Sequence, residues 1–599
     1  MKKIYLTGLF TALALGACNN LDKEPEGVLS TTNPFTGIGE IQSYIDLFYQ
    51  SGLRTQGFRV GGAQGIAGLD IRSDNMSANS PDSRLAGTSA LSDATKLSNY
   101  TNIRNVNFFI LNKENSLDKG ATYQQLVGEA YYFRAWYYYE LLVNYGPVTW
   151  LEKTLDPVQE QMVLPRDSRT YVTDKIIADL DTAASYLSTQ NSNATMRIHR
   201  DVALALKSEV ALFEGTWEKY HKAKNDKFYD QTITESKITQ YLQTAASAAK
   251  EIIDRGVWSI YKGSGPLTSY RDIFKTADLT SNPEILWYKR YDGSNVGNSV
   301  TRYLNKGGGA AGVTRSLVDD YLTIDGRPFV GAERDEAKKT YGDELLPTVR
   351  DPRLSQTICL PGQDLRPNGG YVFTVPPLNA DSYFQNTTGY SLLKHVEFDI
   401  ADPSAVDTDG KGSTPAIQFR YADILLNYAE ALAELDGQAN ATLIIEAIHP
   451  LRDRVGLPDV DFDREYNTES DYPFRNLDKY IQAVRRERRI EKACEGRRFD
   501  DILRWAAADV LIVNQQPQGA LYIGSNLESS YSNLTYDKDS GNNLFLTGKP
   551  GDANRYVLPI NPAVLPNGYQ FKLDRDYLLP IQPRMLSLTE NAWEQNPGW

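Results

Sequence analysis

Apolar residues recur at helical spacing in several long segments of the chain. Intervals of three and four residues define one apolar stripe in each of four segments, residues 123–145, 171–187, 202–217 and 238–253. This periodicity predicts four amphipathic helices, because residues three and four apart lie on one face of a helix. Gly146 and Pro147 follow the first segment directly and predict its C-terminal end.

The same pattern returns further along the chain. From Tyr421 to Leu435 the apolar positions are spaced four, three, four and three, and Gly437 is a candidate C-cap. Residues 444–455 repeat the pattern, although Pro450 is expected to kink this second helix. Two helices within about 36 residues have the size of a tetratricopeptide hairpin, whose period is about 34 residues. Hairpins that recur without a strict sequence repeat predict a degenerate solenoid.

Between the helical segments lie long stretches rich in Gly, Ser, Asn and Asp, and strand-like runs are short, such as residues 284–288. Loops of this length are usually functional or disordered, and a helical scaffold that carries elaborate loops is typical of binding proteins. The pattern therefore predicts a mostly α fold with small β elements. The expected organisation is a helical scaffold at 100–260 and 415–510, loop-rich binding regions at 54–99 and 262–415, and a C-terminal segment at 511–599.

The first residues are typical of a targeting signal. Lys2 and Lys3 precede an apolar stretch over residues 4–15, which is shorter than the ~20 residues that span a bilayer. The run Leu-Gly-Ala-Cys that ends at Cys18 resembles a bacterial lipobox. We therefore expect a signal peptide at 1–17, a lipidated N-terminus and tether at 18–34, and one body at 35–599. The alternative is an ordinary signal peptide, with Cys18 incidental.

Composition excludes several functional classes. The formal net charge of −13 argues against a nucleic-acid partner, because phosphate binding needs a basic surface. Three Cys provide no disulfide framework, and the four His show no metal-ligand spacing. We therefore expect no metal and no cofactor. The 37 Tyr, 20 Phe and 8 Trp can serve core packing or contact surfaces.

Two motifs are better explained by a role in the fold than by ligand binding. The run from Arg485 to Arg504 mixes both signs of charge, which favours intramolecular ion pairs such as Arg497–Asp501 and Asp500–Arg504 at i,i+4 spacing. A GxGxxG pattern over 307–312 lacks the preceding strand of a dinucleotide site. We interpret it as a flexible loop after which Thr314 caps the next helix.

Several segments in order resemble the SusD/RagB family of nutrient-binding outer-membrane lipoproteins. They are the lipobox, GEAYYFRA at 128–135, GTWEKYH at 215–221, RDPRL at 350–354, FRYADILLNYAEA at 419–431, RRERRIEKACEGRRFDDILRW at 485–505 and QNPGW at 595–599. His449, Pro450 and Cys494 depart from the residues that the family more often has at these places.

This resemblance implies about four tetratricopeptide-like hairpins with a loop-rich, irregular remainder. It also implies a lipid-anchored protein of the outer membrane, exposed at the cell surface, that binds glycan and delivers it to a SusC-like TonB-dependent transporter. No catalytic residue is expected. A lipid-anchored glycoside hydrolase, which would need two carboxylates across the scissile bond, is one alternative. A protein–protein scaffold that binds a non-glycan nutrient is the other.

Glycan binding requires aromatic faces for sugar C–H surfaces together with polar groups for hydroxyls. Two loops contain this mixture. The expected glycan-binding residues are Arg72, Asp74 and Asn75 in the first, and Trp287, Tyr291, Asp292 and Tyr303 in the second.

Overall fold

A computed structural model describes residues 33–57, 60–154, 163–366, 371–397 and 407–599. The predicted signal peptide and lipidated Cys18 lie outside these ranges, together with all but the last two residues of the predicted tether. Within the described ranges, no helix combines the length and the apolar character that crossing a bilayer requires.

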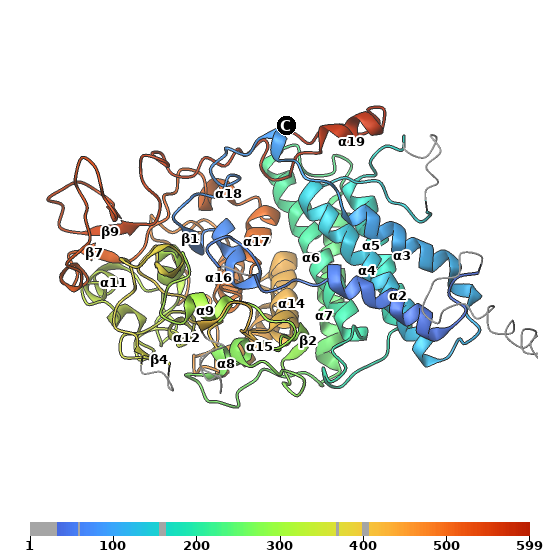
Figure 1. Ribbon diagram of the computed structural model, residues 1–599, viewed down its shortest axis with the longest axis horizontal. Coiled ribbons are helices and arrows are strands. Elements are labelled where there is room, and N and C mark those ends of the chain that lie inside the picture. Colours follow the sequence, from blue (N-terminus) through green and yellow to red (C-terminus); the bar gives the residue numbers. More distant parts are fainter. Residues whose placement is uncertain (1–32, 58–59, 155–162, 367–370, 398–406) are drawn as a thin grey trace, which may run out of the picture.

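Helices stack side by side to form a solenoid on the right of Figure 1. In order of packing it consists of α3 (Asn99–Asn112), α4 (Ala121–Tyr145), α5 (Arg169–Tyr186), α6 (Arg200–Lys224), α7 (Glu235–Asp254), α14 (Tyr421–Asp436) and α15 (Ala441–Asp453). The preceding α2 (Ile38–Ser51) packs on α4. All six helices expected from the periodicity are confirmed, and α15 continues through Pro450.

Local sequence determines where these helices begin and end. The side chains of Ser168 and Thr234 accept hydrogen bonds from backbone N–H groups in the first turns of α5 and α7, which is N-capping. Gly146 follows α4 with φ +72°, a conformation that costs glycine little. The apolar stripes then bury against neighbouring helices in one large core.

The solenoid is interrupted between α7 and α14 by the loop-rich body, residues 255–415, on the left of Figure 1. Within this body, strand β2 (Ile285–Lys289) pairs antiparallel with β6 (Ala416–Arg420), which leads out of it. Because β6 ends where α14 begins, this pairing brings α14 back against α7. A strand-like run at 284–288 was predicted, but its partner was not.

A second apolar core joins residues of the loop-rich body to residues from 60–78 and 490–557. The body itself is made up of short elements. They are α8 (Ser269–Lys275), α9 (Val300–Leu304), β3 (Ala311–Val313), α10 (Arg315–Asp320), α11 (Gly331–Ala337), α12 (Arg353–Thr357), β4 (Asp364–Arg366) and β5 (Tyr371–Val372). Strand β1 (Met76–Ala78) pairs with β3. Thr314 caps α10 as predicted, since its side chain accepts a hydrogen bond from the N–H of Leu317.

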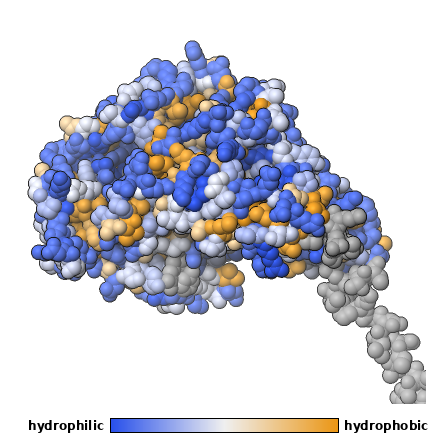
Figure 2. Space-filling view, turned by 90° about the horizontal axis from the view of Figure 1, so that it is seen from above, coloured by the Kyte–Doolittle hydropathy of each residue, from blue (hydrophilic) through white to orange (hydrophobic). Residues whose placement is uncertain are grey.

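The C-terminal part, residues 454–599, contacts both regions, since α16 (Lys479–Glu491) packs on α14 of the solenoid and on α10 of the loop-rich body. Besides α16, this part contains α17 (Arg498–Arg504), α18 (Ala508–Leu511), the three-stranded sheet of β7 (Leu521–Ile523), β9 (Arg555–Leu558) and β8 (Phe545–Leu546), and α19 (Pro583–Leu588). One face of the resulting molecule is largely hydrophilic, with apolar side chains gathered in separate patches (Figure 2).

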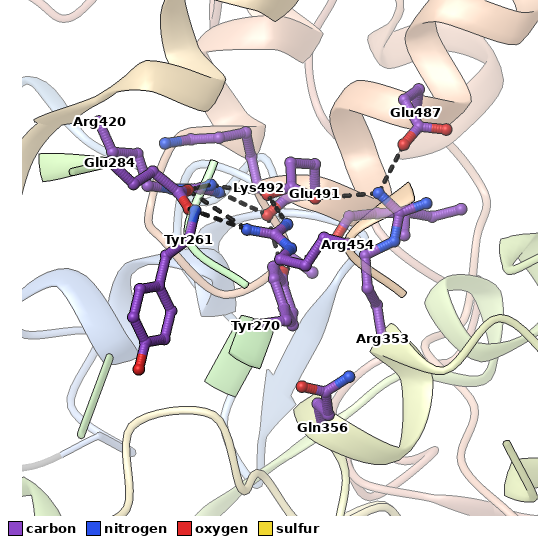
Figure 3. A network of polar contacts seen from close by, with 12 residues as sticks. Tyr261, Tyr270, Glu284, Arg353, Gln356, Arg420, Arg454, Glu487, Glu491 and Lys492 are labelled. Carbon is purple, nitrogen blue, oxygen red and sulfur yellow. Dashed lines mark hydrogen bonds and ion pairs between the residues drawn. The ribbon is translucent and has the colours of Figure 1, made fainter. Parts of the chain in front are cut away.

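The charged run at 485–504 forms a buried ion-pair network that joins the two regions (Figure 3). Glu491 accepts hydrogen bonds from Arg420 on β6 at 2.7 Å, from Arg454 at 2.5 Å and from Arg353 on α12 at 2.9 Å. Arg420 and Arg454 also pair with Glu284. A network of this kind was predicted, and the structure extends it across segments far apart in sequence.

The two specific pairs predicted within the run are wrong. Arg497 pairs instead with Glu209 at 3.0 Å and with Asp500 at 3.7 Å, whereas Arg504 pairs with Glu430 at 2.6 Å. The run consists of two helices, and Arg497 lies at the N-cap of the second, outside the regular i,i+4 geometry. Arg504 lies inside this helix, but its guanidinium is taken up by Glu430 and Asp501.

Candidate functional site

A cleft of about 270 Å³, which we call the polar cleft, lies between the loop-rich body and the C-terminal part. Here two residues of the predicted binding region 54–99, Ser73 and Asp74, face the same space as residues of the predicted region 262–415. Its polar and aromatic lining comprises Ser73, Asp74, Thr314, Arg315, Ser316, Asp319, Asp320, Phe329, Arg334, Asn467, Asp471, Tyr472, Arg489, Gln515, Gln516, Gln518 and Tyr569.

Buried ion pairs form the floor of the polar cleft. Asp74 accepts a hydrogen bond from Arg498 at 2.7 Å and pairs with Arg489 at 2.9 Å. Arg489 also donates to Asp320 at 3.0 Å. Burial alone would raise the pKa of Asp74, but the guanidinium groups of Arg489 and Arg498 lower it to about 2. The charges of the floor are therefore neutralised within the protein.

The walls offer hydrogen-bonding groups beside apolar surface. The half-buried ring of Tyr472 is held by its hydroxyl, which donates to Asp320 at 3.2 Å. Arg315 lies over the ring of Tyr556, 4.1 Å from its centroid. Among the described residues, none hydrogen-bonds the side-chain amides of Gln515 and Gln518. Val330, Pro473 and Val510 supply apolar contact.

Asp74 and Asp319, the two carboxyls of the polar cleft whose pKa is lowered, are poor proton donors. Burial alone would raise the pKa of Asp319, but Lys338 and Arg315 lower it below its ordinary value. A general acid for glycoside hydrolysis needs the opposite, a carboxyl whose pKa is raised. Within the described ranges, no three His, Cys, Asp or Glu side chains are placed to hold a metal ion.

The first predicted loop lies at the polar cleft, but its residues play different parts. Asp74 belongs to the floor. Asn75, 1% exposed, donates to Asp70 at 3.0 Å and accepts from Arg489 at 2.9 Å, so its side chain is used internally. Arg72 faces a different cleft, where it pairs with Asp82 at 3.5 Å.

The second predicted loop lies elsewhere, and its aromatic residues are buried. Trp287 is 2% exposed and donates its indole N–H to the carbonyl of Met196 at 3.1 Å. Tyr291 is 4% exposed, and its hydroxyl accepts the N–H of Gln56 at 3.0 Å. Neither offers a ring face to a sugar, because Trp287 and Tyr291 pack into apolar clusters of the protein.

The other two residues of that loop are also engaged by the protein itself. Asp292 is exposed, and its carboxylate accepts the N–H of Asn295 at 2.7 Å to close a turn. Tyr303 is buried and donates to Asp409 at 3.0 Å. Of the seven predicted residues, Asp74 alone lines the polar cleft.

Sequence reasoning missed Arg315, Tyr472, Gln515 and Gln518. Gln515 and Gln518 fall in the stretch after α18 whose composition indicated a long loop, so the signal was present without a reason to single them out. Arg315 lies in the predicted region 262–415 and Tyr472 lies outside both predicted binding regions. Nothing local in the sequence shows that these residues, 157 positions apart, meet at one cleft.

Comparison with known proteins agrees with this architecture. The family model described as "SusD family" matches residues 283–599, more than half of the chain. A second model, described as "Starch-binding associating with outer membrane", matches residues 67–212. A curated relative, SusD-like protein P38 of Formosa agariphila, is 24% identical over 401 residues, which are 63% of this chain and 66% of that relative. The match thus spans slightly less than two thirds of the relative's length.

Solved structures share the fold over nearly the whole chain. A SusD-like protein from Bacteroides fragilis is 23% identical with a TM-score of 0.65, covering 94% of this chain and 97% of that one. A SusD-like carbohydrate-binding protein from the same organism is 20% identical with a TM-score of 0.68, covering 92% and 98%. Surface glycan-binding protein A from Bacteroides fluxus is 18% identical with a TM-score of 0.55, covering 94% and 99%. The solenoid of helical hairpins, its loop-rich body and the family-model match lead to one conclusion: the chain belongs to the SusD family.

Proposed function

We propose that this chain binds glycan at the polar cleft without cleaving it. The observation that carries the proposal is the cleft itself, with a neutralised floor and walls of amide, guanidinium and apolar groups. A sugar presents hydroxyls that both donate and accept, and C–H faces that pack on apolar side chains. The names of two structural neighbours, a carbohydrate-binding and a surface glycan-binding protein, support this ligand class.

The cleft suits a modest affinity. Gln515 and Gln518 can reach ligand hydroxyls without losing a hydrogen bond to any described residue, and Tyr472 supplies a held ring. A shallow site that covers one or two sugar rings yields about 4–8 kcal/mol of binding free energy, a Kd from mM to μM.

The cellular role completes the proposal. The chain acts as a lipoprotein anchored through Cys18 at the outer-membrane surface, and it passes glycan to a SusC-like TonB-dependent transporter. The description of the second family model, which mentions the outer membrane, supports this location. Release of the protein from the membrane fraction by Cys18→Ala would support the anchor, and a wild-type protein without lipid would contradict it.

Calorimetry with maltohexaose, xylohexaose, mannohexaose and laminarihexaose tests the binding site. With whichever glycan binds the wild type, Tyr472→Ala and the double variant Gln515→Ala/Gln518→Ala should each weaken binding about tenfold or more, since a stacked ring contributes about 1–3 kcal/mol. Tyr472→Phe keeps the ring and is the matched control. Unchanged affinity in both alanine variants would refute the polar cleft as the site.

The hydrolase alternative is tested with the same glycans. We expect no new reducing ends during prolonged incubation, because the carboxyls with lowered pKa at the cleft are poor proton donors. Release of reducing ends that disappears in Asp74→Asn would overturn this part of the proposal.

A further inference from the structure

A larger cleft, which we call the second cleft, lies on the other side of the Arg72–Ser73 segment and has a volume of about 560 Å³. It is bounded by α4, by residues 82–95, by the start of α17 and by the C-terminal residues 579, 580 and 599. Arg54 and Glu140 also line a smaller adjoining cavity of about 280 Å³, to which Trp136 and Tyr137 contribute. The second cleft shares no lining residue with the polar cleft.

Two carboxyl groups face the second cleft with little compensation. Glu140 projects from α4, and no described residue hydrogen-bonds its carboxylate or forms an ion pair with it. Burial, and next the charge of Asp500, raise the pKa of Glu140 to about 7. The other charged groups around it are Arg497, Arg54 and Glu209. Burial also raises the pKa of Asp500, whose nearest cation is Arg497 at 3.7 Å.

Two arginines in the same cleft are held by backbone carbonyls. Arg54 donates to the carbonyls of Glu495 at 2.7 Å and Gly496 at 3.2 Å. Arg84 donates to carbonyls at 2.6 and 2.8 Å. Among the described residues, neither has a carboxylate partner within ion-pair distance. Gly496 has φ +69°, and a Cβ there would lie 2.9 Å from the Arg54 guanidinium. The close contact of Arg54 with this stretch of backbone therefore requires glycine at position 496.

The second cleft is lined by equal numbers of basic and acidic side chains, and because Glu140 is partly protonated near pH 7 their charges nearly balance. Four arginines, residues 54, 72, 84 and 497, face four acids, residues 82, 93, 140 and 500. A charged ligand would therefore find as much repulsion as attraction, whereas hydroxyl groups can donate to the carboxylates and accept from the guanidinium groups. Phe499, Leu579 and Trp599 provide apolar surface beside these polar groups.

We propose that the second cleft binds a neutral sugar unit, with hydroxyls that donate to Glu140 and Asp500 and accept from Arg54. The ligand class rests on the proposed glycan-binding function, but the site is separate. Ionised Glu140 is the better acceptor. Because the pKa of Glu140 is about 7, affinity should rise as the pH increases from about 6 to 8.

The test uses the full chain with its 8 Trp replaced by 5-fluorotryptophan, and the Trp599 signal assigned with Trp599→Phe. Glucose, galactose, mannose, xylose and maltose are titrated to about 50 mM, since single sugars bind in the mM range. We expect at least one sugar to shift the Trp599 fluorine resonance saturably. Glu140→Ala should weaken this binding about fivefold or more, and Glu140→Gln should abolish its pH dependence.

The controls separate this proposal from the glycan site at the polar cleft. Tyr472→Ala should leave the Trp599 titration unchanged. If glycan binds at the polar cleft but no sugar shifts Trp599, or if Glu140→Ala titrates like the wild type, the second cleft is not a sugar site. The opposite result is also informative. If sugars still shift the Trp599 resonance, but Tyr472→Ala and Gln515→Ala/Gln518→Ala bind hexasaccharides like the wild type, only the proposed site at the polar cleft is refuted.

Discussion

The helical solenoid and the loop-rich body bury their polar groups in different ways. In the solenoid the backbone satisfies its own hydrogen bonds, and apolar stripes from successive helices meet in one core. In the loop-rich body side chains take over this task. Arg350 is fully buried and donates to the carbonyls of Val318 and Tyr321, both at 2.7 Å, and of Glu344 at 3.0 Å.

This difference explains why the cleft that we propose as the glycan site lies beside the loop-rich body. Irregular backbone leaves peptide groups that need side-chain partners, and those same loops provide the walls of the polar cleft. The solenoid supplies rigidity, and the buried ion pairs around Glu491 fasten the body to it. Substitutions that break this junction should therefore lower the free energy of unfolding the most, and substitutions within one loop should lower it the least.

The largest effect is expected from Glu491→Gln. Three guanidinium groups share this carboxylate in a fully buried position, so its loss leaves buried charge uncompensated. We expect the free energy of unfolding to fall by about 3–5 kcal/mol in urea denaturation. Asp278→Asn, at an exposed pair with Arg290, is the control and should cost at most about 1 kcal/mol. Equal costs would mean that the network does not join the regions.

Trp287→Ala tests whether β2 anchors the loop-rich body on the solenoid. Its ring lies edge-on to Tyr49 and Tyr132, with centroids at 6.1 and 5.8 Å. We expect a loss of about 3–5 kcal/mol of stability, as for other buried aromatic residues replaced by alanine. Tyr171→Ala, at an exposed ring, provides the comparison. If Trp287→Ala is as stable as the wild type but binds glycan more weakly, Trp287 contacts the ligand and this account of β2 is wrong.

Acid should weaken the floor of the polar cleft. The pKa of Asp74 is about 2 in the folded protein, below the ordinary carboxyl value of 3.8. The unfolded chain therefore binds the proton first, and the stabilisation is present above pH 4 and lost as the pH falls toward 2. We expect this contribution to be about 2 kcal/mol. Asp74→Asn should be less stable than the wild type at pH 7, and the difference should shrink near pH 2. A constant difference would contradict the ion-pair account.

Tyr291→Phe is expected to have the smallest effect. It removes only the hydroxyl that accepts the N–H of Gln56, which costs about 1–2 kcal/mol in a buried site. Glycan affinity should not change, because Tyr291 lies away from the polar cleft. Loss of affinity with normal stability would show that this loop contacts ligand after all.

The sequence by itself determined the solenoid. Its helices are long, their apolar periodicity is strong, and caps such as Ser168 and Gly146 are local features, so a short window of residues contains the information. The ordered segments from 128 to 599 were also sufficient to identify the family, which the family-model match confirmed.

Only the tertiary structure decided which polar residues meet. Trp287 and Tyr291 carry glycan-binding chemistry in sequence, yet β2 pairs with a strand about 130 residues away and turns them inward. Arg315 and Tyr472 look ordinary in sequence, yet they line one cleft. The physical reason is that short irregular elements have no periodicity of their own, so long-range strand pairing and buried ion pairs determine which side chains face solvent.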